Sequence, residues 1–192
     1  MKNKYYNTQW SSLNWEETLE KTKEEENKLA KYLKEKVGFR DVIRTGDAQK
    51  SIHGLKIPDL YGTHKNGITY YIELKHKNRR MKYNDNGVDE DLLKNYLKVQ
   101  EEFNIRVILI FIDNDKEWKS DFPDVESYFK DELGECTYYG HFLDYLVDST
   151  PTNPKNRIFN YKWIQCFPLS IMVKIPDLFR DRQTELNTSV IK

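Results

Sequence analysis

The chain has 192 residues and a formal net charge of zero, with 38% hydrophobic, 14% aromatic and 32% charged residues. This length suits one domain with a buried core, and the aromatic content is too high for a disordered chain. The longest apolar run, Val107 to Ile112, is far shorter than the roughly 20 residues that span a bilayer. The N-terminal residues, MKNKYYNTQW, lack the apolar core of a signal peptide, so we expect a cytoplasmic protein without a membrane partner.

The charge is distributed unevenly along the chain. Residues 37–82 hold ten Lys and Arg against four Asp and Glu, whereas residues 113–136 hold nine acids against three lysines. A protein of zero net charge would not coat nucleic acid indiscriminately, but one basic face can still hold a polyanion. The acidic stretch is interpreted as a solvated surface or a contact for another subunit.

The predicted elements begin with an N-terminal arm, residues 1–15, which packs onto the body. A helix follows from about Trp15 to Lys36, because the apolar positions of its second half recur at the helical period and Gly38 suits a C-cap. The segment from Phe39 to Arg44 is β-branched and predicts a strand. The residues after it, TGDAQKSIHG, have turn and loop chemistry.

Two further strands and a second helix come next. The segment IPDLYGTH predicts a short strand with Pro58 near its start, where a missing N–H is tolerated. The alternating, β-branched and aromatic segment from Ile68 to Lys75 predicts another strand. After a polar loop, NRRMKYNDNG, a continuous apolar face predicts a helix from about Asp89 to Phe103. The run IRVILIFID is typical of a strand that is covered on both sides.

The C-terminal part, from Asn114 onward, has a less regular pattern. The segments DVESYFKDEL and YGHFLDYLV predict helices, TPTNPKN predicts a turn, and RIFNYKWIQCFPLSIMVKI predicts one or two strands. The order helix, strand, strand, strand, helix, strand predicts an α/β fold with a central mixed sheet flanked by helices. We expect a single domain over residues 1–192, with a core at about 24–112 and an α+β elaboration at 113–192.

Three side chains form the pattern that carries chemistry. Asp59 lies in IPDL, and fourteen residues later IELK places Glu73 and Lys75 two positions apart on one strand. Both side chains therefore project from one face, while Ile72 and Leu74 point the other way into the core. Two carboxylates on neighbouring strands can hold a hard cation such as Mg²⁺. A lysine beside them can orient or deprotonate a water, or offset charge in the transition state of phosphodiester hydrolysis.

Each part of this pattern also has a purely structural interpretation. A Pro-Asp pair is common in turns, and in a chain with 31 acidic and 31 basic residues an ExK triplet also fits an ion pair on an exposed strand face. The arrangement favours the functional interpretation. The PD pair opens one strand, ExK closes the next, an acidic helix precedes both, and a helix and a buried strand follow.

With these motifs, the region from about Glu24 to Ile112 resembles the core of the PD-(D/E)xK nuclease superfamily. That superfamily includes restriction endonucleases and archaeal-type Holliday junction resolvases. The resemblance implies a restriction-endonuclease-like sheet, with Asp59 and Glu73 as ligands of Mg²⁺ or Mn²⁺ and Lys75 as the catalytic lysine.

The first helix adds one more residue to this resemblance. The segment EEENKLAKYLKEKVGF is similar to the resolvase helix that supplies a further glutamate to the site. Aligning its leucines gives this place to Glu26, and Glu25 is the alternative. The loop from Thr45 to Lys56 is longer than the family's minimal version, so its residues stay unaligned.

Other side chains near this centre are candidates for substrate contact or for packing. Gln100 is an accessory candidate facing the site or a satisfied core amide, and one turn earlier Tyr96 suits core packing. His76 alternates away from Lys75 and is interpreted as structural. A basic segment follows the catalytic strand, and it either clamps phosphates or is simply solvated. Its members are Lys77, Arg79, Arg80 and Lys82.

Three functions stay open. The first is a Mg²⁺-dependent endonuclease that hydrolyses DNA, restriction- or resolvase-like, and acts as a homodimer because cutting two strands usually needs two active sites. The second is an inactive nucleic-acid-binding module, which the intact Asp-Glu-Lys set argues against. The third is a non-enzymatic protein that mimics DNA or binds a partner, and the zero net charge argues against a mimic. The sequence leaves open DNA against RNA, and endonuclease against exonuclease.

Overall fold

The computed structural model describes residues 15–47, 51–77, 85–113, 138–150, 157–159 and 162–180. The predicted N-terminal arm and the predicted helix DVESYFKDEL lie outside these residues, apart from Trp15. No helix within the described ranges is long and apolar enough to cross a membrane.

The described residues form helices, a main sheet and two smaller sheets. The helices are α2 (Trp15–Tyr32), α3 (Glu90–Phe103) and α5 (Leu143–Ser149). The strands of the main sheet are β1 (Phe39–Arg44), β4 (Leu60–His64), β5 (Thr69–Lys77), β7 (Arg106–Asp113), β8 (Tyr139–Phe142) and β11 (Val173–Lys174). A second sheet contains β6 (Asp85–Asp89), β10 (Lys162–Pro168) and β9 (Arg157–Phe159), and a small hairpin contains β2 (Ser51–Ile52) and β3 (Leu55–Lys56).

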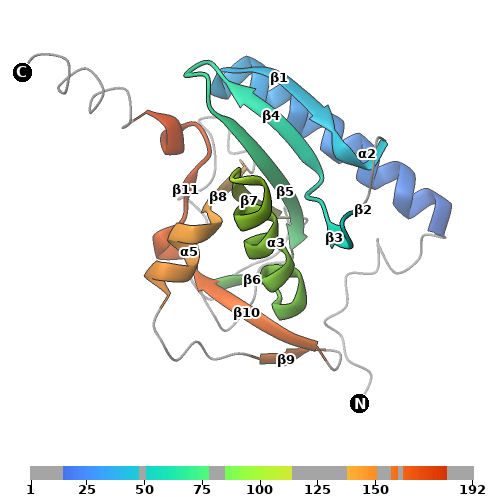
Figure 1. Ribbon diagram of the computed structural model, residues 1–192, viewed down its shortest axis with the longest axis vertical. Helices are drawn as coiled ribbons and strands as arrows, with labels where there is room; N and C mark the ends of the chain where they lie inside the picture. The colour runs from blue at the N-terminus through green and yellow to red at the C-terminus, as the bar shows by residue number, and fades with distance from the viewer. Residues whose placement is uncertain are drawn as a thin grey trace, which may run out of the picture.

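The main sheet has the order β1-β4-β5-β7-β8-β11 and is mixed, because β5 and β7 are parallel while the other pairs are antiparallel. Figure 1 shows α2 and α3 on opposite sides of this sheet. The predicted α/β class, a central mixed sheet flanked by helices, is confirmed. Strands β8 and β11 come from the C-terminal part, which therefore extends the same sheet.

The first helix ends where the sequence predicts, but with a change of winding. After α2 the chain continues through a π-helical turn, η1 (Leu33–Val37), before it stops at Gly38. Gly38 has φ of 98°, which glycine adopts without steric cost, and its N–H donates to the Leu33 carbonyl at 3.0 Å. The chain then turns directly into β1.

The sheet separates two apolar cores, one on each face. The α2 face buries Leu29 and Leu33 of the helix against Ile72 and Leu74 of β5. The α3 face buries Leu93, Tyr96 and Val99 of the helix against β7. Val107, Ile108, Leu109, Ile110 and Phe111 of β7 are all fully buried, which confirms the strand predicted to be covered on both sides.

Four predicted elements differ from the structure. The predicted loop TGDAQKSIHG contains strand β2, and RIFNYKWIQCFPLSIMVKI contains three strands, β9, β10 and β11, in place of the one or two predicted. The end of the predicted loop NRRMKYNDNG is strand β6, which pairs with β10, and a Cβ on Gly87 would lie 2.4 Å from the Gln165 carbonyl oxygen. The start of the predicted helix YGHFLDYLV is strand β8, which pairs with β7. Both strands form because a distant segment of the chain supplies the partner, which outweighs local turn or helix preference.

Candidate active site

The site lies where β4 and β5 separate. Their antiparallel pairing runs from Thr63↔Thr69 to Leu60↔Ile72, and Asp59 stands just before β4 after Pro58. The next backbone N–H on this side of β5, that of Leu74, donates to Asp59 Oδ2 at 3.0 Å. The Asp59 carboxylate thus takes the position of a strand partner, which fixes it against the end of β5.

A threonine at the end of β1 holds the backbone of Asp59. The Thr45 N–H donates to the Asp59 carbonyl at 3.0 Å, and the Thr45 hydroxyl donates to the Pro58 carbonyl. These bonds connect β1 to the turn that presents the carboxylate. Sequence analysis did not identify Thr45, because it belongs to the loop that stayed unaligned.

Glu73 is the buried centre of the cluster, with 1% of its surface exposed. One of its oxygens, Oε2, accepts the Asp59 N–H at 3.3 Å, and the other, Oε1, accepts the Lys75 ammonium. The structure therefore brings the three predicted residues Asp59, Glu73 and Lys75 together. Two carboxylates and one ammonium share this site, in which Glu73 is buried while Asp59 and Lys75 are half-buried.

The buried position of Asp59 has a strong effect on its protonation. Burial, followed by the charge of Glu73, raises the pKa of Asp59 to about 8, and the charge of Glu26 adds to this. The charge of Lys75 and the Leu74 N–H act in the opposite direction. The Asp59 carboxyl therefore tends to keep its proton at neutral pH, and a bound cation would favour the ionised form of both acids.

Lys75 keeps its proton in these surroundings. Burial works to lower the pKa of Lys75, but the charge and hydrogen bond of Glu73 outweigh it, and the charges of Asp59 and Asp89 add to the effect, so the pKa is raised. The ammonium also lies 5.9 Å from the centre of the Tyr96 ring on α3. At neutral pH this group is a fixed positive charge.

Tyr96 covers the cluster from the α3 side. The Tyr96 hydroxyl is buried near Glu73. It forms no hydrogen bond of normal geometry with any of the described residues. Burial, followed by the charge of Glu73, raises the pKa of Tyr96 well above its usual range. The phenol therefore stays neutral, and the sequence pattern predicted only packing at this position.

The two glutamates of the first helix have different surroundings. Glu26 is 8% exposed, accepts a hydrogen bond from Arg44 Nε at 2.6 Å, and adds its charge to the environment of Asp59. Glu25 pairs with Lys28 at 2.7 Å. Burial, followed by the charge of Glu25, raises the pKa of Tyr138 to about 12. The structure thus brings Glu26 near the cluster and directs Glu25 elsewhere.

The remaining candidates are the accessory residue Gln100 and the basic segment that begins at Lys77. Gln100 accepts the Val107 N–H through Oε1 at 2.7 Å, so its amide joins α3 to β7, and its accessory role stays a prediction. The backbone of Lys77 ends β5. The side chain of Lys77 and all of Arg79, Arg80 and Lys82 lie outside the described residues, so their role in binding stays a prediction.

Two of the acids have the chemistry of a cation site. Within the described ranges no three His, Cys, Asp or Glu side chains gather closely enough to hold a metal by themselves. Mg²⁺, however, is commonly bound through one or two carboxylates, with waters and substrate oxygens completing its shell. Asp59 and Glu73 supply two such carboxylates, joined through the Asp59 N–H, and so they fit this arrangement.

Comparisons with known proteins give a likeness to solved structures only. No family model and no curated protein matches the chain. Among solved structures, it is similar to Hjc of Archaeoglobus fulgidus, a Holliday junction resolvase from an archaeal hyperthermophile. The likeness covers 82% of this chain and 98% of that chain, at 12% sequence identity and a TM-score of 0.47. The proposed function therefore rests on the side chains of the site and not on this likeness.

Proposed function

We propose that the protein is a metal-dependent nuclease that hydrolyses phosphodiester bonds of DNA, an endonuclease with Mg²⁺ or Mn²⁺ as its cofactor. The observation that carries the proposal is the buried cluster of Asp59, Glu73 and Lys75, in which two carboxylates and one ammonium meet at the end of β5. A structural ion pair would need one acid for one base. The second acid, Asp59, accepts the Leu74 N–H through one oxygen, and its raised pKa beside Glu73 is typical of a functional site.

Asp59 and Glu73 would hold the divalent cation, which supplies activation of a water and neutralisation of phosphoryl charge in such sites. Glu26 is the further acid that approaches from α2, and its pairing with Arg44 keeps it oriented toward the same region. In this proposal Thr45 and the Leu74 N–H are positioning groups, since they hold Asp59 and do not touch the substrate.

Hydrolysis forms a bond from a water oxygen to phosphorus and breaks the bond from phosphorus to the leaving sugar oxygen. The water loses a proton and the leaving oxygen gains one. Because Lys75 stays protonated, its part is to orient the water by hydrogen bonding and to offset negative charge on the phosphoryl oxygens. A base role for Lys75, which the sequence alone left open, would require a lowered pKa.

The proposal also includes the partner, the assembly and the location that the sequence predicts. DNA is the proposed substrate, a homodimer the proposed assembly, and the cytoplasm the proposed location. Branched DNA belongs among the substrates to be tried, since the solved structure reported above is of a Holliday junction resolvase.

The test is a panel of nucleic acids incubated with the protein. Plasmid, linear duplex, four-way junction and single-stranded DNA, together with RNA, are each treated in Mg²⁺, in Mn²⁺ and in EDTA. We expect metal-dependent cleavage of at least one DNA and loss of that cleavage in Glu73→Gln. No cleavage of any nucleic acid in either metal, or equal cleavage by Glu73→Gln, would contradict the proposal.

A further inference from the structure

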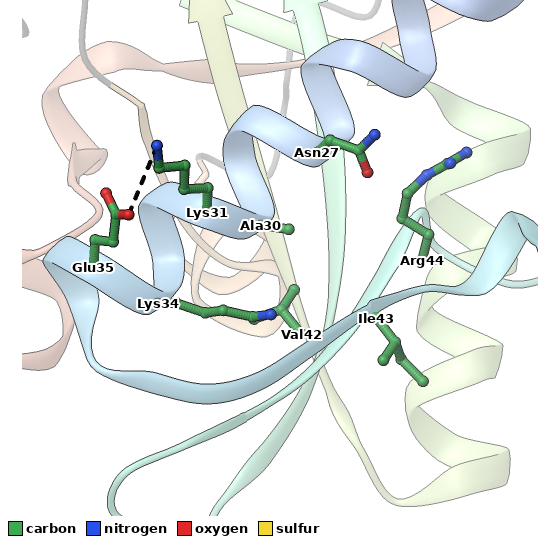
Figure 2. A pocket seen from close by; sticks show the side chains of 8 residues that line it. All are labelled: Asn27, Ala30, Lys31, Lys34, Glu35, Val42, Ile43 and Arg44. Carbon is green, nitrogen blue, oxygen red and sulfur yellow. Dashed lines mark ion pairs between the residues drawn. The ribbon is translucent and has the colours of Figure 1, made fainter.

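A groove lies beside the site, between α2 and β1, and encloses about 560 Å³ (Figure 2). One side of the groove comes from the helical segment of α2 and η1, and the other side comes from β1. The residues that define this groove are Asn27, Lys31 and Lys34 from the first helix and Val42, Ile43 and Arg44 from β1. We call it the α2–β1 groove.

The α2–β1 groove approaches the candidate active site through Arg44. Arg44 lines the groove, and its Nε donates to Glu26, the acid of α2 whose charge acts on Asp59. Figure 2 shows Asn27 and Arg44 at one end of the groove and the ion pair of Lys31 with Glu35 at the other. A ligand that lies along the groove therefore meets Arg44, the partner of Glu26, at one end.

The charge of the groove favours an anion. Three of the lining side chains are cationic, those of Lys31, Lys34 and Arg44, and Glu35 is the acid among them. Lys31 is 74% exposed and only loosely paired with Glu35, at 3.8 Å. Figure 2 shows the Lys34 side chain extended along the groove beside Val42. The two ammonium groups are thus available to a ligand in solution.

The floor of the groove is apolar. It contains Ala30 and Val42, while Ile43, 58% exposed, lines the strand edge of the groove with its side chain pointing away from the helix in Figure 2. Cations along the rim and an apolar floor match a sugar–phosphate chain, in which charged phosphates alternate with apolar sugar faces. A single small anion would leave the apolar floor in water.

We propose that the α2–β1 groove seats the phosphodiester backbone of the nucleic-acid strand that enters the site. This inference rests on the proposed function and adds to it the path of the substrate, with Lys31 and Lys34 as phosphate contacts. Each phosphate that a lysine neutralises releases counterions, so the contacts should appear in the salt dependence of binding.

The experiment compares two double variants that remove the same charge. Lys31→Gln with Lys34→Gln empties the groove of its two ammonium groups. The control, Lys94→Gln with Lys98→Gln, removes two exposed lysines of α3, of which Lys94 is 63% exposed and pairs with Glu90 as Lys31 pairs with Glu35. Arg44 is left unchanged because its partner Glu26 belongs to the site.

Binding is measured by fluorescence anisotropy with a labelled DNA duplex in EDTA, over a series of salt concentrations, so that no hydrolysis interferes. For the groove variant we expect weaker binding and a slope of log K against log salt that is smaller by up to about 2, near 0.9 per lost phosphate contact. The control should keep the wild-type slope. Light scattering on all three proteins checks that the oligomeric mass is the same.

Equal slopes for the groove variant and wild type, or equal losses in both double variants, would overturn the groove as the path of the strand. A changed mass only in the groove variant would also overturn it, because the groove would then be a contact between copies. Failure of the proposed function is distinguishable: the wild type would bind DNA with the expected slopes but cleave nothing in Mg²⁺ or Mn²⁺. A wild type that binds no DNA would overturn both.

Discussion

The two faces of β5 belong to one strand but carry opposite kinds of side chain. The face toward α2 places Tyr70, Ile72 and Leu74 in an apolar core. The face toward α3 places Glu73 and Lys75 beneath Tyr96. A buried ion pair is weak support for stability, because desolvation of the charges offsets their attraction. The α2 face of β5, the apolar face, therefore contributes apolar burial alone, while its α3 face, the polar face, combines the apolar contact of Tyr71 with the charged pair.

The largest expected effect is on the apolar face. Ile72→Ala should lower the free energy of unfolding by about 4 kcal/mol, since Ile72 is fully buried and the variant leaves a cavity. Ile68→Ala is the control, because Ile68 is 46% exposed, and it should cost less than about 0.5 kcal/mol. Urea denaturation measures both. Similar losses would mean that this face is not the one that stabilises the sheet.

On the polar face, Lys75→Ala should lower the rate of DNA cleavage by ~10² while the protein stays folded, the scale expected when one preorganised charge is removed. Lys75→Arg should restore only part of the rate, since a planar guanidinium does not fit the place of an ammonium against Glu73. The exposed Lys65 provides the control, and Lys65→Ala should cleave like wild type. Circular dichroism verifies folding, and a fully active Lys75→Ala protein would refute the site.

Metal binding should stabilise the protein only through the acids of the polar face. At a Mn²⁺ concentration ten times its Kd, the wild type should gain about 1.4 kcal/mol of stability, because the ion binds only the folded site. Asp59→Asn should gain much less, while Asp91→Asn, at an exposed position of α3, should respond like wild type. Thermal denaturation with and without Mn²⁺ gives the comparison. Equal gains in all three proteins would remove Asp59 from the ligands.

The smallest expected effect concerns a polar residue within the apolar face. Burial lowers the pKa of His64, whose Nε2–H donates to the Val37 carbonyl at 3.2 Å while Nδ1 accepts the Asn66 N–H at 3.4 Å. Below about pH 6.5 the unfolded chain takes up a proton that folded His64 resists. Stability should therefore fall with decreasing pH, by at most about 1.4 kcal/mol per pH unit from this group.

This contribution is isolated by comparing urea denaturation of the wild type and His64→Gln from pH 8 to pH 5. Above pH 7 the difference between the two proteins should be constant, because the histidine is neutral in both folded and unfolded states. Below pH 7 the difference in the free energy of unfolding between the wild type and His64→Gln should become smaller. A constant difference across the whole range would show that His64 titrates alike in both states.

Much of the contrast between the two faces of β5 could be predicted from the local sequence. Alternation of polar and apolar residues placed Ile72 and Leu74 on the core face of β5, and the spacing of IPDL and IELK brought Asp59 and Glu73 into one site. These features depend on neighbouring residues of two adjacent strands, and strand geometry fixes them.

Other parts of the site depend on residues far apart in the chain, and local pattern does not contain them. Arg44 meets Glu26 because β1 packs beside α2, and Thr45 meets Pro58 across a hairpin. Strand β6 was mistaken for a loop because its partner, β10, lies much later in the sequence. Such pairings are set by tertiary packing, which outweighs local propensity.

The parallel pairing of β5 with β7 has a consequence for the order in which the protein folds. Strands β4 and β5 are joined by a short turn, so the hairpin that unites Asp59 and Glu73 closes a small loop at low entropic cost. Strand β7 joins only after the crossover through β6 and α3, which makes this step slower. A chain halted between the two steps would expose one edge of β5 along its whole length, next to two adjacent acids. That intermediate would be the species most prone to mispairing with another chain during synthesis.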